Sequence, residues 1–273
     1  MQTFTGKTFA SFYKNILGID QGSNTGIDQG VRNVQDGAGN NSAINLSDDQ
    51  CRVQPNTDNT TTTFAVGNQA GSTVFAVDTT NSKVLTGASQ VAANTQYAHF
   101  GITSVLSSLG NDTHYAIPFS AMSGGGLASA ANLTLGTSTT SSFNDTNPAT
   151  SLTISDSAMD IVQTYWYVMD NITIDEVKWF HGADAATGED TAAHLMSYTV
   201  NTANGSGSGD LSSGTVVADG ANITNAGYEQ IYYQTMTVQS ADIAAGKVIL
   251  FTFASDTVNS DYTISATIKY HLR

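Results

Sequence analysis

Apolar and polar positions follow three patterns along the 273-residue chain, and the changes between these patterns divide it into three segments. Residues 6–17 place apolar side chains at helical spacing, whereas residues 19–96 carry only short apolar groups between turn-forming residues. Residues 97–273 carry longer runs, many of which alternate between apolar and polar. The patterns predict an all-β chain with a helical N-terminal segment (1–18), a turn-rich β shaft (19–96) and a larger β domain (97–273).

The first segment has the clearest helical pattern in the chain. Its apolar side chains recur every three or four residues, so they would form one stripe on a helix that Gly18 ends. A helix of about twelve residues is marginal alone, so the stripe needs a partner. That partner is either the chain's own domain or a second protein. We favour an anchor that docks on another protein, or on symmetry-related copies, through Phe9, Phe12, Tyr13, Ile16 and Leu17.

The second segment is poor in large apolar residues (Val, Ile, Leu, Met, Phe, Trp and Tyr). Residues 18–96 contain 15 of them in 79 positions, whereas residues 97–273 contain 55 in 177. Phe64–Val66 and Val74–Val77 flank the turn GNQAG, a pattern typical of a β-hairpin. The segment is therefore either disordered or ordered by sharing its few apolar side chains with identical chains.

Alternation within the hairpin favours the second possibility, because alternating apolar residues are typical of strands with one buried face. The repeated sequence GIDQG, at residues 18–22 and 26–30, adds one isoleucine in each copy. We therefore predict an extended, intertwined β shaft in a homotrimer. Its predicted core consists of Ile19, Ile27, Ile44, Leu46, Phe64, Val66, Phe75 and Val77.

The third segment has candidate strands at a spacing of about 10 to 20 residues. Clean alternation in residues 171–180 and 263–272 predicts strands with one face in water. The nearly continuous apolar run at residues 247–253 predicts a central strand that is buried on both faces. Eight to ten antiparallel strands would form a β-sandwich, for which we predict the jelly-roll arrangement.

Charge narrows the range of partners. The net charge is −14, and residues 97–273 account for −12 of it with 16 acidic and 4 basic side chains. Such a surface repels nucleic acid and anionic membranes, so we expect neither as a partner. Cys51 is the single cysteine, which excludes an internal disulfide. Since no secretory leader or membrane-spanning run is recognisable, we expect synthesis in a cytoplasm.

One polar cluster could carry chemistry. His181, Asp184, Glu189, Asp190 and His194 could bind a metal or act in acid–base catalysis, but their spacing matches no zinc template. We interpret the segment as an exposed loop between strands, with metal binding as the alternative. Neither a nucleophile elbow nor a phosphate-binding glycine loop is present. We therefore expect a protein that is not an enzyme, without cofactor or metal, although paired carboxylates for glycoside cleavage stay an alternative.

The aromatic residues of the third segment allow two interpretations. In a strand, Tyr165 and Tyr167 share one face and Trp166 takes the other. One face would then pack in the core and the other at a subunit interface. Alternatively, exposed aromatic rings would stack on a sugar. The candidates for a glycan site or an interface are Tyr165, Tyr167, Trp179 and Tyr232.

Three stretches between residues 9 and 86 resemble the N-terminal region of virion structural proteins of tailed phages. They are FYKNILGIDQGSNTGID, VRNVQDGAGNNSAINLSDDQCRVQP and FAVGNQAGSTVFAVDTTNSKVL. The resemblance implies a homotrimer that attaches to the particle by its N-terminus and continues as a slender shaft to a projecting jelly-roll head. It also implies location on the virion, after synthesis in the host cytoplasm.

The short chain favours one place on the particle, because tail fibres are usually far longer. We therefore expect a capsid decoration (cement) or head-fibre protein. Its partners would be its own copies and the major capsid protein or another virion protein. The alternative is a short tail fibre, or receptor-binding protein, that recognises a host surface glycan.

Overall fold

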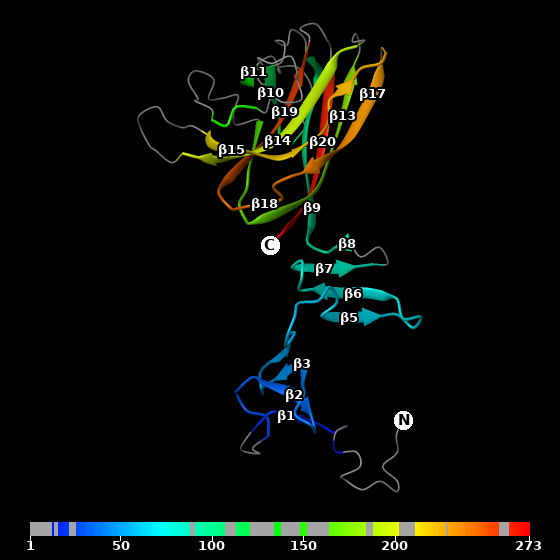
Figure 1. Cartoon of the computed structure of the whole chain (residues 1–273), viewed down its shortest axis with the longest axis vertical. Helices are drawn as coiled ribbons and strands as arrows, with labels where there is room; N and C mark the ends of the chain where they lie inside the picture. The colour runs from blue at the N-terminus through cyan, green and yellow to red at the C-terminus, as the bar shows by residue number, and fades with distance from the viewer. Residues whose placement is uncertain are drawn as a thin grey trace. The chain divides into compact units, whose positions relative to one another are not determined.

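The structure is a computed structural model. In it the chain forms two compact units, Met1–Asn94 and Thr95–Arg273 (Figure 1). The division lies two residues before the predicted boundary at 96/97. The structure describes residues 13, 16–21, 26–87, 91–106, 113–120, 134–137, 148–151, 164–183, 188–201, 211–227, 229–256 and 262–273. Every named element within these ranges is a β-strand, and every pairing is antiparallel, so the all-β prediction is confirmed.

The predicted N-terminal helix lies mostly outside the described residues, which include Tyr13 and Ile16 but not Phe9 or Phe12. Leu17, the last residue of the predicted helix, is instead the first residue of β1 (Leu17–Ile19), so that part of the prediction is wrong. Its backbone pairs with Asp36 of β2. Pairing with β2 gives the backbone N–H and C=O groups hydrogen-bond partners, which they would lack at the end of a short helix.

The N-terminal unit contains two four-stranded meanders, in which each strand pairs with the next along the chain. The predicted hairpin is confirmed, since Phe64 pairs with Val77 and Val66 with Phe75. The first meander is β1, β2 (Arg32–Asp36), β3 (Asn41–Leu46) and β4 (Cys51–Val53); the second is β5 (Phe64–Gly67), β6 (Thr73–Asp78), β7 (Lys83–Thr86) and β8 (Val91–Ala92).

Aspartate side chains close the tight turns of these meanders. Asp36 Oδ1 accepts hydrogen bonds from the backbone N–H groups of Ala38 and Asn40, both at 2.9 Å, and Gly39 takes the positive φ of 85° that the turn requires. Asp78 accepts hydrogen bonds from the backbone N and the Nδ2 of Asn81 at 2.9 and 2.7 Å. The abundance of Asp and Asn thus produces turns, as the composition predicts.

The C-terminal unit contains one twelve-stranded sheet whose two halves face each other. Its strands follow the order β11-β10-β19-β14-β15-β17-β13-β20-β9, with β12, β16 and β18 paired alongside. The strands are β9 (Thr95–Leu106), β10 (Thr113–Ile117), β11 (Thr134–Thr137), β12 (Tyr165–Tyr167), β13 (Ile172–Ala183), β14 (Asp190–Val200), β15 (Leu211–Asp219), β16 (Ile223–Thr224), β17 (Gln230–Val238), β18 (Asp242–Ile243), β19 (Lys247–Ser255) and β20 (Tyr262–Leu272).

The sheet folds over where β15 meets β17, since only two residue pairs join these strands. At the opposite edge, a bridge between Phe100 and Phe119 connects β9 to the end of β10. We name the two halves the β20 layer (β17, β13, β20 and β9) and the β19 layer (β10, β19, β14 and β15). Both layers are visible in the upper part of Figure 1.

The main hydrophobic core lies between the two layers. The ring of Trp179 on β13 lies 6.4 Å from the ring of Phe251 and 6.0 Å from that of Phe253, both on β19. Inward and outward residues alternate along β20, as its sequence predicts. Residues Val248–Ser255 are all buried, which confirms the prediction for the apolar run of β19.

A second apolar cluster explains why β19 is buried on both faces. Leu250 and Val248 pack there against Tyr198 of β14. The hydroxyl of Tyr198 donates a 2.8 Å hydrogen bond to the carbonyl oxygen of Ala149, so the chain near residue 149 lies against this second face. Burial raises the pKa of Tyr198, which keeps its hydroxyl a neutral donor.

Replacing Phe251 with alanine should lower the free energy of unfolding of the C-terminal unit by about 3–5 kcal/mol, because it removes a fully buried ring between the layers. Urea denaturation followed by tryptophan fluorescence measures this change, since Trp166 and Trp179 both lie in this unit. Tyr167→Ala is the control, because Tyr167 is exposed and its loss should cost only about 0.5 kcal/mol. Equal losses in the two variants would contradict the proposed core.

Candidate functional site

The β5–β8 meander has one apolar face whose side chains are exposed or half-buried in the described part of the chain. Residues directly opposite in an antiparallel pair lie on the same face. The pairs Phe64–Val77, Val66–Phe75 and Val77–Val84 therefore place five apolar side chains together. The rings of Phe64 and Phe75 lie edge to face, with centroids 6.2 Å apart. Phe64 is nevertheless 43% exposed and Val66 45%.

The opposite face of the same meander holds its buried residues. Ala76 is fully buried, and it pairs with Ala65 and Leu85. Asp78 is buried too, with its carboxylate held by Asn81. Hydrogen bonds from Asn81 lower the pKa of Asp78 despite the opposing effect of desolvation, so the carboxylate stays charged. This face is thus buried in part, although Ala65 on it is exposed, whereas the face of Phe64 and Val66 has no buried side chain among the described residues.

The β1–β4 meander repeats this arrangement. Ile19 pairs with Val34 and Ile44 with Val53, and Leu46 shares the face of Ile44 two residues further along β3. Ile44 is 44% exposed. Apolar side chains therefore line much of one exposed face of this meander, which also carries Arg32, the partner of Leu46 in the ladder.

The other face of the β1–β4 meander is polar and joined by hydrogen bonds. Asn33 pairs with Asn45, which is buried. The amide of Asn56 bridges this region: its Nδ2 donates to the carbonyl oxygens of Asn41 and Ser42, and its Oδ1 accepts from Asn33 Nδ2 at 3.1 Å. The polar groups therefore find partners within the chain, whereas the apolar groups do not.

None of the eight residues predicted as shaft core is buried in the single chain. Ala76 is the only fully buried apolar residue among the described part of Met1–Asn94. The structure gathers Phe64, Val66, Phe75 and Val77 on one face, but it places Ile27 outside the strands with 54% exposure. The two groups of shaft residues, Ile19, Ile44 and Leu46 on one meander and Phe64, Val66, Phe75 and Val77 on the other, each form one exposed or half-buried face.

A third exposed face lies on the outside of the β20 layer. Tyr233, Phe180, Ser265 and Gly101 pair in a row across β17, β13, β20 and β9. The rings of Phe180 and Tyr233 lie 5.9 Å apart. We name this surface the outer face; its exposed large side chains are Ile231 (77%), Tyr233 (72%), Tyr97 (58%) and Phe180 (40%).

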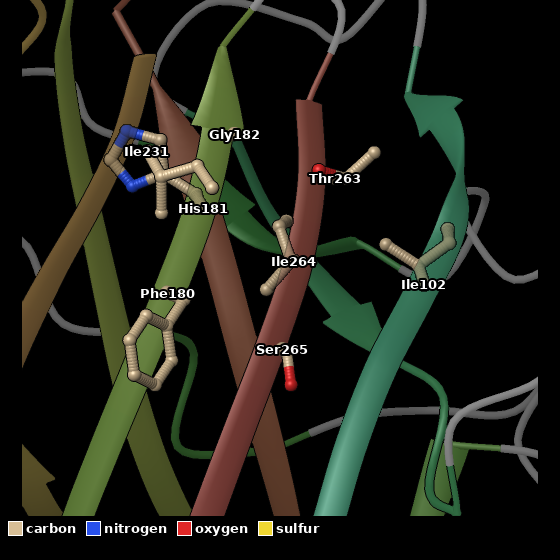
Figure 2. A pocket seen from close by; sticks show the side chains of 8 residues that line it. All are labelled: Ile102, Phe180, His181, Gly182, Ile231, Thr263, Ile264 and Ser265. Carbon is tan, nitrogen blue, oxygen red and sulfur yellow. The ribbon is translucent and has the colours of Figure 1, made fainter.

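Two shallow hollows lie on the outer face and share Phe180 as a wall. Figure 2 shows the first, of about 320 Å³, whose lining comes from all four strands of the β20 layer. Lys178 Nζ lies 3.0 Å from Glu176 Oε1 in the second. The second hollow, of about 350 Å³, is lined by Tyr97, Glu176, Lys178, Phe180, Thr267 and Lys269.

The aromatic residues selected from the sequence are mostly not the exposed ones. Trp179 is fully buried in the core, so a glycan cannot reach it. Tyr232 is half-buried and stacks on His181 with ring centroids 5.0 Å apart. Their neighbours Phe180 and Tyr233 carry the exposed rings instead, since adjacent strand residues face opposite sides. Alternation along β13 and β17 assigns these residues to two faces but does not show which face lies in the core.

The Tyr-Trp-Tyr sequence of β12 alternates as predicted. Trp166 is directed to the main core, where its ring stacks on that of Phe119 at 6.0 Å. Tyr165 packs against the second apolar cluster instead. Tyr167 lies at the end of the strand and is 47% exposed. Of the four aromatic candidates from the sequence, only Tyr167 is therefore open to a glycan or a partner.

The polar cluster that was predicted from the sequence between His181 and His194 is divided between two places. His181 lies in the main core, where its Nε2 is 2.9 Å from Asn225 Oδ1. Asn225 Nδ2 donates to the hydroxyl of Tyr262, which donates to Glu189 Oε2 at 2.6 Å. These bonds form a buried network rather than an open catalytic site.

His194 lies on β14, apart from this network, and contacts the ring of His114 at 5.1 Å. The predicted exposed loop is wrong for Asp190 and His194, which both belong to β14, because the apolar residues between them enter the sheet. Asp184 lies outside the described residues. No group of three metal-ligating side chains occurs in the part of the chain that the structure describes.

A comparison of the chain with protein-family models matches no family, and a comparison with curated proteins finds no match. No helix among the described residues is long and apolar enough to cross a membrane.

The stability of the C-terminal unit should fall as the pH drops from 6.5 towards 3. Burial and the neighbouring His114 lower the pKa of His194 to about 3, and burial lowers the pKa of His181. The unfolded chain binds protons at these imidazoles below about pH 6.5, whereas the folded chain does not, so unfolding takes up protons. His194→Gln should reduce this slope by up to about 1.4 kcal/mol per pH unit.

Urea denaturation between pH 4 and pH 7 measures the slope. Met196→Ala is the matched control, because Met196 is buried on the same face of β14 but does not titrate. It should lower stability at every pH and leave the slope unchanged. An unchanged slope in His194→Gln would show that His194 titrates alike in the folded and unfolded chains.

Proposed function

We propose that this chain is a non-enzymatic structural protein of a tailed-phage particle, and that it works as a homotrimer. Its Met1–Asn94 unit forms a shaft in which the apolar faces of three copies cover one another. One observation carries the proposal: both N-terminal meanders leave their apolar faces open while their polar faces are satisfied within the chain. A unit that folded for itself would bury the opposite set of side chains.

The energetics favour association through these faces. Each apolar side chain contributes about 1.5–3 kcal/mol when it is fully buried. The β5–β8 meander offers five such side chains on one face, and none of them is buried among the described residues. Two copies face to face or three around an axis would both cover them. The resemblance to virion proteins of tailed phages favours three.

The order of the long strands supports a jelly-roll head. Numbered one to eight in chain order, the strands β9, β10, β13, β14, β15, β17, β19 and β20 form one layer in the order 1-8-3-6 and the other in the order 2-7-4-5. This order is the one expected of a jelly roll, an arrangement that viral capsid and lectin domains share. The likeness concerns the fold, and by itself it assigns no activity.

On the particle, the N-terminal segment (1–18) would attach the trimer to the major capsid protein or another virion protein. Leu17 is 69% exposed and is available for such a contact. Three anchors on one trimer bind with high avidity even when each is weak. A protein that binds the assembled shell, but not its separate subunits, stabilises the shell by mass action. We therefore place the protein on the capsid as a decoration or head-fibre protein.

A short tail fibre is the second candidate. The observation that favours it is the set of exposed rings on the outer face, since aromatic side chains offer flat apolar surfaces to sugars. In that case the head would contact a host surface glycan.

Full-length protein should sediment as a trimer of 28.5 kDa chains. Val66→Glu should weaken the trimer at least about 100-fold, because it buries a carboxylate in an apolar contact. Ala65→Glu is the matched control: Ala65 is also exposed, but as the neighbour of Val66 on β5 it lies on the opposite face of the same meander. A monomeric wild type, or equal effects of the two variants, would overturn the proposed shaft.

Immunogold labelling of intact particles tests the location. We expect gold over the capsid surface at many places on each particle. Labels restricted to the tail would contradict a decoration protein and support a short tail fibre. Particles that carry no label, although their unlabelled lysate contains the protein, would contradict a virion role altogether.

A further inference from the structure

The second hollow of the outer face gathers basic side chains in a unit that is otherwise acidic. Residues 97–273 contain 4 basic side chains against 16 acidic ones. Lys178 and Lys269 line the hollow, which therefore holds half of the basic side chains but one acidic side chain, Glu176. These three charges sum to +1, whereas the unit has a net charge of −12. The lining of the hollow thus favours an anionic ligand.

Lys269 carries the ammonium group that such a ligand can reach. It pairs with Glu176 across β20 and β13, but Glu176 Oε1 lies 3.0 Å from Lys178 Nζ. Lys269 makes no ion pair with any other residue that the structure describes. A hydrogen bond between an ammonium and a carboxylate is about twice as strong as one between neutral groups. A ligand carboxylate would therefore bind Lys269 without displacing another partner.

The negative charge of the remaining unit acts only weakly on this place. At physiological ionic strength, exposed charges farther away than about 8 Å are largely screened. The next carboxylate along β13 is that of Asp175, and its Oδ2 lies 2.8 Å from His271 Nδ1. The side chains that line the hollow therefore determine which ligand it attracts.

Two exposed aromatic rings lie at opposite corners of the same hollow. Tyr97 of β9 shares a row of the sheet with Lys269, whereas Phe180 of β13 lies two rows further along and two strands away. Their Cα atoms are therefore about 16 Å apart. Aromatic rings offer flat apolar surfaces to sugars. The polar side chains of Thr267 and Lys178 line the space between the rings, where they can bind sugar hydroxyls.

The place of the hollow in the sheet favours a saccharide over a peptide. It lies over the face of β9, β20 and β13, which pair with one another, so its floor offers no open edge to an added strand. An amphipathic helix binds in an apolar groove, whereas three of the six lining side chains here are charged. A sugar chain uses both flat rings and hydrogen-bonding groups, and the hollow provides both.

We propose that the second hollow binds an acidic saccharide, that is, a sugar chain that carries carboxylate groups. Lys269 donates hydrogen bonds to a sugar carboxylate, and Glu176 accepts them from sugar hydroxyls. Tyr97 and Phe180 stack on the sugar rings. The hollow belongs to a single chain, so the inference goes beyond the proposed function and does not depend on the trimer.

An array of immobilised glycans, probed with the full-length protein, tests the class of ligand. The array carries oligogalacturonates, their methyl esters, sialylated oligosaccharides and neutral oligosaccharides. We expect binding to the glycans with free carboxylates, and at least about 10-fold weaker binding to the methyl esters, which lack the charge that Lys269 meets. Added salt should weaken the binding. Binding to no glycan, or equal binding to the free acids and their esters, would overturn the proposal.

Substitutions test the site with the glycan that binds best. Lys269→Gln should weaken its binding about 10-fold. Lys247→Gln is the matched control, because it removes the same charge from the same unit, but on β19, where its Nζ donates to Thr199 Oγ1. Thermal unfolding checks that both variants are folded. Equal binding by the two variants would show that Lys269 does not hold the carboxylate.

The aromatic rings have a control of their own. Tyr97→Ala and Phe180→Ala should each weaken binding about five-fold, because each removes one stacking surface. Tyr167→Ala should leave binding unchanged, since Tyr167 is an exposed ring on β12, outside the β20 layer. Unchanged binding in both Tyr97→Ala and Phe180→Ala would contradict a sugar site between these rings.

Two further measurements separate the possible outcomes. Inorganic phosphate that displaces the glycan at equal concentration would show a general anion site and overturn the saccharide. Sedimentation of the same samples keeps this inference apart from the proposed function. A monomer that binds acidic glycans overturns the trimer alone, whereas a trimer that binds none overturns the saccharide site alone.

Discussion

A sheet with one apolar face requires a second layer, and this requirement organises the whole molecule. In the C-terminal unit, the β19 layer covers the β20 layer, and Trp179 fills the space between them. In the described part of the N-terminal unit, each meander has four short strands, and the side chains of its apolar face are exposed or half-buried. In the proposed shaft, other copies would supply the contacts that the C-terminal unit makes within one chain.

The N-terminal unit differs from the C-terminal unit in more than its lower content of apolar residues, as its hydrogen bonds show. An unstable or misassembled unit would leave both kinds of group without partners. Here the side chains of Asp36, Asn56 and Asp78 satisfy turns and strand ends locally, so the polar half of the unit is complete. The apolar half is the part that a partner would cover, as expected for a chain that folds together with its copies.

The sequence predicted the fold class and the hairpin, because alternation and turn residues act locally. It also predicted β19 as a doubly buried strand from its run of apolar residues. The exposed aromatic residues were predicted wrongly in part: the sequence analysis named Trp179 and Tyr232, whereas Phe180 and Tyr233 are the exposed residues. Which face of a strand meets the other layer depends on pairing across distant residues, and composition does not contain that information. The buried network from His181 to Glu189 was missed for the same reason.

Hydrogen exchange at different protein concentrations tests most directly whether copies supply the missing contacts. At concentrations where the trimer forms, the account predicts slow exchange of the backbone amides of β5 and β6 (Phe64–Gly67 and Thr73–Asp78). On dilution to the monomer, these amides should exchange fast, while those of β19 and β20 keep their protection. Equal protection of β5 and β6 in trimer and monomer would contradict the account, because the N-terminal unit would then be stable by itself.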